Sequence, residues 1–149
     1  MRMKIKIFLD TNILMDVLME DRPLTAVSNK VFQTVLSNKT EGVLVAQSFV
    51  DASYMYLRKN PGGYDKFRDF VAKLCNFFNI HYIDTFALNY ACHQNSGDFE
   101  DDAMYYVARS SFCDVIVTSD KLFKERHQGE DPNIQIMTPE EFVAKITVS

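Results

Sequence analysis

The chain has 149 residues, of which 47% are hydrophobic and 24% charged, and its formal net charge is −4 at pH 7. We expect a single domain over residues 1–149, because this length can bury a core without disulfides or a structural metal. The negative charge excludes a protein that binds nucleic acid through a broad basic surface, but it is compatible with an acidic site that holds metal ions. No apolar run approaches the roughly 18 residues of a membrane span, and the first ten residues do not resemble a signal peptide. We therefore expect a cytoplasmic protein.

Strand and helix patterns alternate along the chain. Residues 4–9 (KIKIFL) pass from alternation to a continuous apolar run, which is typical of a buried strand. Similar short apolar segments predict strands at residues 43–46, 81–83, 114–117 and 134–137. Helical periodicity predicts helices at residues 11–20, 24–37, 48–59, 64–78, 85–93 and 99–111.

Several helix boundaries carry local signals. Ser48, Thr85 and Asp98 are expected to be N-caps. Residues 138–141 (TPEE) predict a further helix, with threonine at the N-cap, proline at N1 and a glutamate at N3 that completes a capping box. Residues 121–132 are polar and predict a long loop.

This alternation of strands and helices predicts an α/β fold with a parallel sheet covered by helices on both faces. Right-handed crossovers place the carboxyl ends of all strands at one edge, where ligand sites of such sheets lie. Asp10 follows the first strand and Asp120 follows the strand at residues 114–117. Because adjacent carboxylates repel each other, such a pair favours a bound cation, and oxygen ligands suit Mg²⁺ or Mn²⁺. The alternative for each aspartate is a helix N-cap.

Two helices add acidic residues. Asp101 and Asp102 lie in the first turn of the helix at residues 99–111, where the helix dipole also favours acids without any catalytic role. Asp51 lies among apolar residues in the first turns of the helix at residues 48–59. A carboxylate there, in an otherwise apolar segment, indicates a functional role.

Four segments, in order along the chain, resemble the motifs of one family. KIFLDTNILMDVL resembles the first strand and helix of PIN domains, and DFEDDAMYYVA resembles their central acidic helix. DVIVTSD resembles the strand that ends in Thr-x-Asp, and IQIMTPEEFVAKI resembles the closing strand and helix. The resemblance covers the whole chain.

The resemblance implies a flavodoxin-like three-layer α/β/α sandwich and a Mg²⁺- or Mn²⁺-dependent ribonuclease. It implies metal ligands at Asp10, Asp101 and Asp120, with Asn12 and Thr118 in support. Many relatives are the toxin of a toxin–antitoxin pair, so RNA and an antitoxin protein are the implied partners, and a homodimer is left open.

The sequence departs from the family pattern at two site positions. The acid of the third helix is usually glutamate, and here the candidate is Asp51, which is one methylene shorter. In the central helix, a gap-free match of DFED selects Asp101 as the ligand, whereas a match of the Asp-Ala pair selects Asp102. We favour Asp101 and keep Asp102 as the alternative.

A carboxylate cluster without a catalytic histidine or serine fits metal-assisted hydrolysis of a phosphodiester. The candidate partners for substrate phosphates are the basic residues Arg58, Lys59, Lys121, Lys124 and Arg126. A phosphatase of the haloacid-dehalogenase type is disfavoured, because Asn12 stands where that chemistry needs a second aspartate. A catalytically weak PIN-like module that binds nucleic acid or regulates another protein remains the alternative.

Overall fold

A computed structural model describes residues 4–148 of the chain. Five parallel strands form one sheet in the order β3-β2-β1-β4-β5. The strands are β1 (Lys6–Leu9), β2 (Glu41–Val45), β3 (Asn79–His81), β4 (Val115–Val117) and β5 (Gln135–Met137). The chain moves outward from β1 through β2 and β3, then crosses back to build β4 and β5 on the other side. The carboxyl ends of β1 and β4 therefore flank the point where the strand order reverses, which is where sheets of this kind bind ligands.

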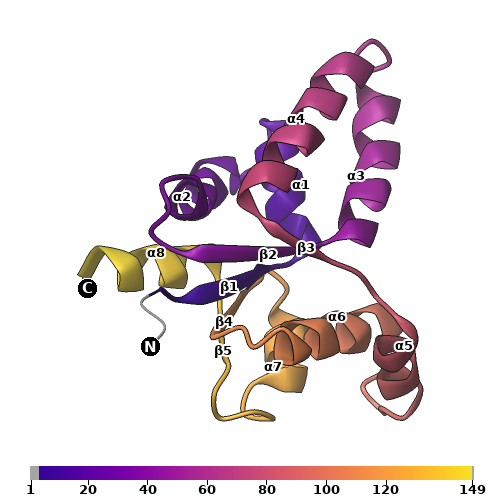
Figure 1. Ribbon diagram of the computed structural model, residues 1–149, viewed down its shortest axis with the longest axis vertical. Helices are drawn as coiled ribbons and strands as arrows, with labels where there is room; N and C mark the ends of the chain where they lie inside the picture. Colours follow the sequence, from indigo (N-terminus) through magenta and orange to yellow (C-terminus); the bar gives the residue numbers. More distant parts are fainter. Residues whose placement is uncertain (1–3, 149) are drawn as a thin grey trace.

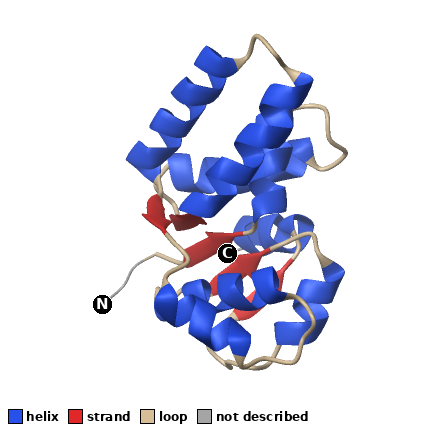
Figure 2. Cartoon of the chain, turned by 90° about the vertical axis from the view of Figure 1, so that its right-hand side faces the viewer, coloured by secondary structure: helices blue, strands red, loops and turns tan. Residues whose placement is uncertain are grey.

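The helices form a layer on each face of the sheet. They are α1 (Thr11–Met19), α2 (Thr25–Leu36), α3 (Ala46–Lys59), α4 (Tyr64–Phe77), α5 (Thr85–Cys92), α6 (Phe99–Ser110), α7 (Lys121–His127) and α8 (Pro139–Val148). Helices α1 to α4 and α8 lie on one side, and α5 to α7 lie on the other (Figure 1). Helices α3 and α4 form a hairpin that extends away from the sheet (Figures 1 and 2). The predicted three-layer, flavodoxin-like sandwich is confirmed.

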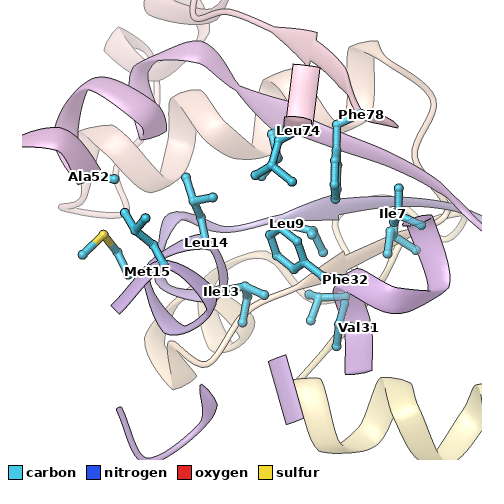
Figure 3. Packing of buried hydrophobic residues seen from close by; sticks show 14 of the residues in the cluster. Ile7, Leu9, Ile13, Leu14, Met15, Val31, Phe32, Ala52, Leu74 and Phe78 are labelled. Atoms are coloured by element: carbon cyan, nitrogen blue, oxygen red, sulfur yellow. The ribbon is translucent and has the colours of Figure 1, made fainter. Parts of the chain in front are cut away.

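The central strand β1 explains why the sheet is covered on both faces. Ile7 and Leu9 pack into the core beneath α1 and α2, whereas Phe8 packs into the core on the α6 side, and all three are fully buried. Figure 3 shows the first of these cores, with Phe32 of α2 and Leu74 of α4 closing over β1. A strand buried on both faces needs apolar residues at every position, as the predicted apolar run has.

Several boundaries differ from the predicted ones. Strand β3 lies two residues earlier than residues 81–83. Helix α3 begins at Ala46, directly after β2, and the Ser48 hydroxyl lies 2.6 Å from the Thr11 hydroxyl instead of capping the helix. The cap of α5 is Asp84, whose carboxylate accepts from the Ala87 N–H at 2.9 Å, and not Thr85.

The C-terminal third contains one confirmed signal and one wrong prediction. The capping box is confirmed, because Thr138 and Glu141 exchange hydrogen bonds of 3.1 and 2.9 Å between side chain and backbone. The predicted loop at residues 121–132 is wrong, since its first half forms α7. Among residues 4–148, no helix is long and apolar enough to cross a membrane.

The close packing of β2 against α4 predicts that Gly42 tolerates no side chain. A Cβ atom there would lie 2.5 Å from the Phe78 ring and 2.9 Å from Val35. We expect Gly42→Ala to lower the free energy of unfolding by about 1–3 kcal/mol in urea denaturation. Gly62→Ala is the control, because among the described atoms nothing lies within 4 Å of its added Cβ. Equal stability of the two variants would contradict the packing argument.

Candidate active site at the edge of the sheet

Asp10 and Asp120 meet at the carboxyl ends of β1 and β4. Asp10 is 7% exposed, and its carboxylate accepts from the Thr118 hydroxyl at 2.7 Å and from the Thr11 N–H at 2.8 Å. The Thr118 hydroxyl also accepts from the Asp120 N–H at 3.0 Å. Thr118 therefore links the two strand ends and fixes the orientation of Asp10, while Asn12 lies half-buried in the first turn of α1.

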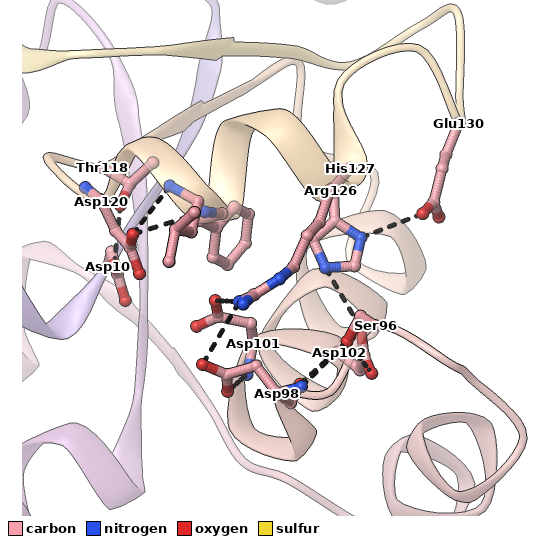
Figure 4. A network of polar contacts seen from close by, with 12 residues as sticks. Asp10, Ser96, Asp98, Asp101, Asp102, Thr118, Asp120, Arg126, His127 and Glu130 are labelled. Atoms are coloured by element: carbon pink, nitrogen blue, oxygen red, sulfur yellow. Dashed lines mark hydrogen bonds and ion pairs between the residues drawn. The ribbon is translucent and has the colours of Figure 1, made fainter.

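The first turn of α6 brings further carboxylates to this edge. Asp98 caps the helix by accepting from the Asp101 N–H at 3.0 Å, as predicted. The Asp101 side chain lies on the side of α6 that faces Asp10 and Asp120 (Figure 4). Arg126 of α7 reaches into the group, with its Nη1 at 3.3 Å from Asp101 Oδ2 and 3.5 Å from Asp98 Oδ2.

Asp10, Asp98, Asp101 and Asp120 form an acidic group, and their charges raise the pKa of Asp10 and of Asp101. Burial, together with the charges of Asp98, Asp10 and Asp120, raises the pKa of Asp101 to about 7, while Arg126 acts in the opposite direction. Burial also raises the pKa of Asp10, and the hydrogen bond from Thr118 only partly offsets this. Because of this burial and mutual repulsion, a positive charge bound at this edge would stabilise the ionised carboxylates.

Asp51 and Glu100 line one cavity, and their charges interact. The cavity has a volume of about 240 Å³, and Thr11, Ser48, Asp51 and Glu100 are among its lining residues. Burial raises the pKa of Glu100, and Asp51 is the carboxylate that contributes most to the rest of the shift. Asp51 is exposed and not packed in an apolar interior. Its position on α3 places it close enough to Glu100 of α6 for their charges to interact.

Asp102 points away from the acidic group. It is 2% exposed, and its Oδ2 accepts from the Ser96 hydroxyl at 2.7 Å. Its Oδ1 lies 3.2 Å from His127 Nε2, an ion-pair distance without the geometry of a hydrogen bond. His127 Nδ1 lies 3.1 Å from Glu130, and the ring stacks on Tyr105 with centroids 4.6 Å apart. Asp102 thus joins α6 to α7 (Figure 4).

The basic residues proposed from the sequence have different positions. Lys121 and Lys124 line a cavity of about 390 Å³ together with Thr118 and Asp120. Lys124 also pairs with Glu141 at 3.3 Å. Arg58 and Lys59 lie in the last turn of α3, at the end remote from the sheet, so the structure does not bring them to the acidic group (Figure 1).

Sequence reasoning did not assign Asp98 and Glu100 to the site, although both lie in the DFEDD segment that it singled out. The signal was present, because a helix that begins near the strand edge brings its N-cap and several first-turn acids close to it. Carboxylate oxygens fit Mg²⁺ or Mn²⁺. Among residues 4–148, however, no three ligating side chains are already grouped closely enough to hold a metal ion.

The comparison with protein families identifies the class of protein. The model of the PIN domain matches residues 6–122, which include β1, α6 and β4. The chain therefore belongs to the PIN-domain family. None of the curated proteins matches the chain.

Three solved structures share this fold. PAE2754 from Pyrobaculum aerophilum has a TM-score of 0.62 and 16% identity, covering 97% of this chain and 91% of that chain. VapC20 from Mycobacterium tuberculosis, a toxin that cleaves the sarcin–ricin loop, has a TM-score of 0.64 and 13% identity over 80% of this chain and 94% of that chain. VapBC2 from Rickettsia felis, bound to a DNA fragment from its promoter, has a TM-score of 0.60 and 13% identity over 90% and 98%.

The raised pKa of Asp101 predicts a pH-dependent stability without metal. The unfolded carboxyl titrates near its ordinary value of 3.8, whereas the folded one titrates at about 7. Between these values the folded protein binds more protons than the unfolded chain, so the free energy of unfolding falls as the pH rises. We expect the Tm in EDTA to decrease from about pH 4 to about pH 7, and Asp101→Asn to reduce the slope. An unchanged slope in the variant would contradict the assignment.

Proposed function

We propose that this PIN-domain protein is a metal-dependent ribonuclease that hydrolyses RNA phosphodiester bonds. The observation that supports this most is the convergence of Asp10, Asp101 and Asp120 at one edge of the sheet, where burial and the charges of neighbouring carboxylates raise the pKa of Asp101 to about 7. Arg126 offsets the cost of placing these acids together only in part, so a bound cation would stabilise this edge.

Asp10, Asp101 and Asp120 would hold the ion, which we propose to be Mg²⁺ or Mn²⁺. Such an ion lowers the pKa of a bound water and neutralises charge that develops on the phosphate. Asp10 is the central ligand, because Thr118 and the Thr11 N–H already fix its carboxylate at 2.7 and 2.8 Å. Asn12 follows Asp10 by two residues and supports the same strand end.

Asp51 and Glu100 would act from the side of the smaller cavity. Both lie on elements that border the acidic group, and their charges interact. We propose that Asp51 orients or deprotonates a water and that Glu100 shares this task. This assigns to Asp51 the position of the third-helix acid, with its shorter reach compensated by an open approach.

Lys121 and Lys124 are the proposed partners of the substrate phosphates. They line the cavity next to Asp120, so a backbone phosphate bound there would lie beside the acids. Arg58 and Lys59 would contact only RNA that extends along the α3–α4 hairpin. The acidic group itself repels phosphate, so these cations determine the direction from which RNA enters.

We further propose that the protein is a toxin whose activity an antitoxin partner restrains. The shared fold with VapC20, a toxin that cleaves the sarcin–ricin loop, supports this assignment. The alternative is a catalytically weak module that binds nucleic acid or regulates another protein. The lack of three preassembled ligating side chains among residues 4–148 favours that alternative, and metal titration separates the two.

The activity test removes metal from the protein or replaces single aspartates of the proposed metal site. We expect the protein to cleave single-stranded RNA with Mg²⁺ or Mn²⁺ and to lose activity in EDTA. Asp10→Asn and Asp101→Asn should lower turnover by about 100-fold or more, because each removes a metal ligand.

Asp102→Asn is the matched control for Asp101→Asn. It should lower the Tm, because His127 loses a buried charged partner at 3.2 Å, but most of the cleavage should remain at temperatures where the variant is folded. Full activity of Asp101→Asn beside an inactive, folded Asp102→Asn would reverse the assignment. RNA cleavage that persists in EDTA would refute the metal-dependent function.

Asp51→Glu tests the acid of the third helix. Because Asp51 is exposed and borders a cavity, the extra methylene should fit with a change in stability below about 0.5 kcal/mol. We expect Asp51→Glu to retain or raise RNA cleavage and Asp51→Asn to lower it, as measured by initial rates at saturating Mg²⁺. Normal cleavage by Asp51→Asn would show that Asp51 has no part in the chemistry.

A further inference from the structure

Arg126 pairs with two carboxylates of the acidic group, Asp98 and Asp101. Its side chain is 26% exposed, and the guanidinium points from α7 toward the first turn of α6 (Figure 4). One nitrogen, Nη1, lies within 3.3 Å of Asp101 and 3.5 Å of Asp98. The chain therefore places its own cation against a carboxylate that the proposed function assigns to a metal ion.

Helix α7 is anchored on both sides of Arg126. Phe123 is fully buried, and His127 is 2% exposed and stacks on Tyr105 of α6. Asp120 caps the first turn by accepting from the Leu122 N–H at 2.9 Å. These contacts fix α7 against α6. The backbone of Arg126 is therefore held in place, and only its side chain is free to move.

We propose that Arg126 is an intramolecular counter-ion that holds Asp101 in the metal-free protein and is displaced when a metal ion binds there. This inference rests on the proposed metal site. The two cations compete because they bind the same carboxylate of Asp101 and because a guanidinium repels a divalent ion at such distances. Once displaced, the guanidinium lies beside the acids and is free to bind a substrate phosphate.

The first test measures metal affinity by calorimetry with Mg²⁺ and Mn²⁺. Arg126→Ala and Arg126→Gln should bind either ion about fivefold to tenfold more tightly than the wild type, because no ion pair has to be broken. Arg68→Ala is the control, since it removes the same charge from α4, where Arg68 pairs with the exposed Asp65 at 3.5 Å and lies over the Tyr64 ring. Its affinity should equal that of the wild type. Unchanged or weaker binding in both Arg126 variants would overturn the proposal.

The second test separates displacement from a simple change in local charge. In the wild type, the NMR signals of the Arg126 Nη1 protons should be protected from solvent exchange without metal, because Nη1 makes both ion pairs. They should shift and exchange faster on addition of Mg²⁺. Metal binding that leaves these signals unchanged would overturn the role of Arg126 while leaving the metal site intact. If neither the wild type nor the Arg126 variants bind metal, the proposed function fails together with the inference.

Discussion

Repulsion among carboxylates at one edge of the sheet is the constraint on which this site depends. A parallel sheet brings the carboxyl ends of β1 and β4 together, and with them Asp10 and Asp120. The same acids also cap helices: Asp10 caps α1, Asp98 caps α6 and Asp120 caps α7. Capping and metal binding are therefore not competing explanations, because three helix N-termini directed at one place supply partial positive charge that offsets the repulsion. Burial and the charges of Asp98, Asp10 and Asp120 nevertheless raise the pKa of Asp101 to about 7.

The fold and the strand-end acids could be predicted because their signals are local. The apolar run before Asp10 requires a strand buried on both faces, and the rules of parallel sheets then fix the edge at which Asp10 and Asp120 lie. The choice between Asp101 and Asp102 could not be settled in this way. Adjacent helical residues point about 100° apart, and both side chains are buried. Which of them faces the strand ends depends on how α6 rotates against α7, and tertiary contacts alone determine that rotation.

Helix α7 shows why part of the site was hidden in the sequence. Its seven residues, KLFKERH, contain only Leu122 and Phe123 as apolar side chains, too few for a helical period. Its stability comes from tertiary packing of Phe123 and His127 on α6, so it was predicted as a loop. Arg126 was predicted only as a candidate partner for substrate phosphates. A basic residue in a polar segment gives no sign that it pairs with a carboxylate of another helix, since that pairing needs the helix to be in place first.

Asp101 and Asp102 divide two tasks between adjacent positions, and this division couples the site to the packing of α7. Asp101 pairs with Arg126, while Asp102 lies 3.2 Å from His127, the next residue along the same helix. Ser96 holds the second oxygen of Asp102, so the carboxylate cannot rotate toward the strand ends without losing a buried hydrogen bond. The contact that fixes α7 thus also fixes the point from which Arg126 reaches Asp101. If a metal ion has to displace Arg126, its affinity depends on the fit between α6 and α7 as well as on the ligands. A substitution at His127, which lies outside the acidic group, would then alter metal binding through the position of Arg126.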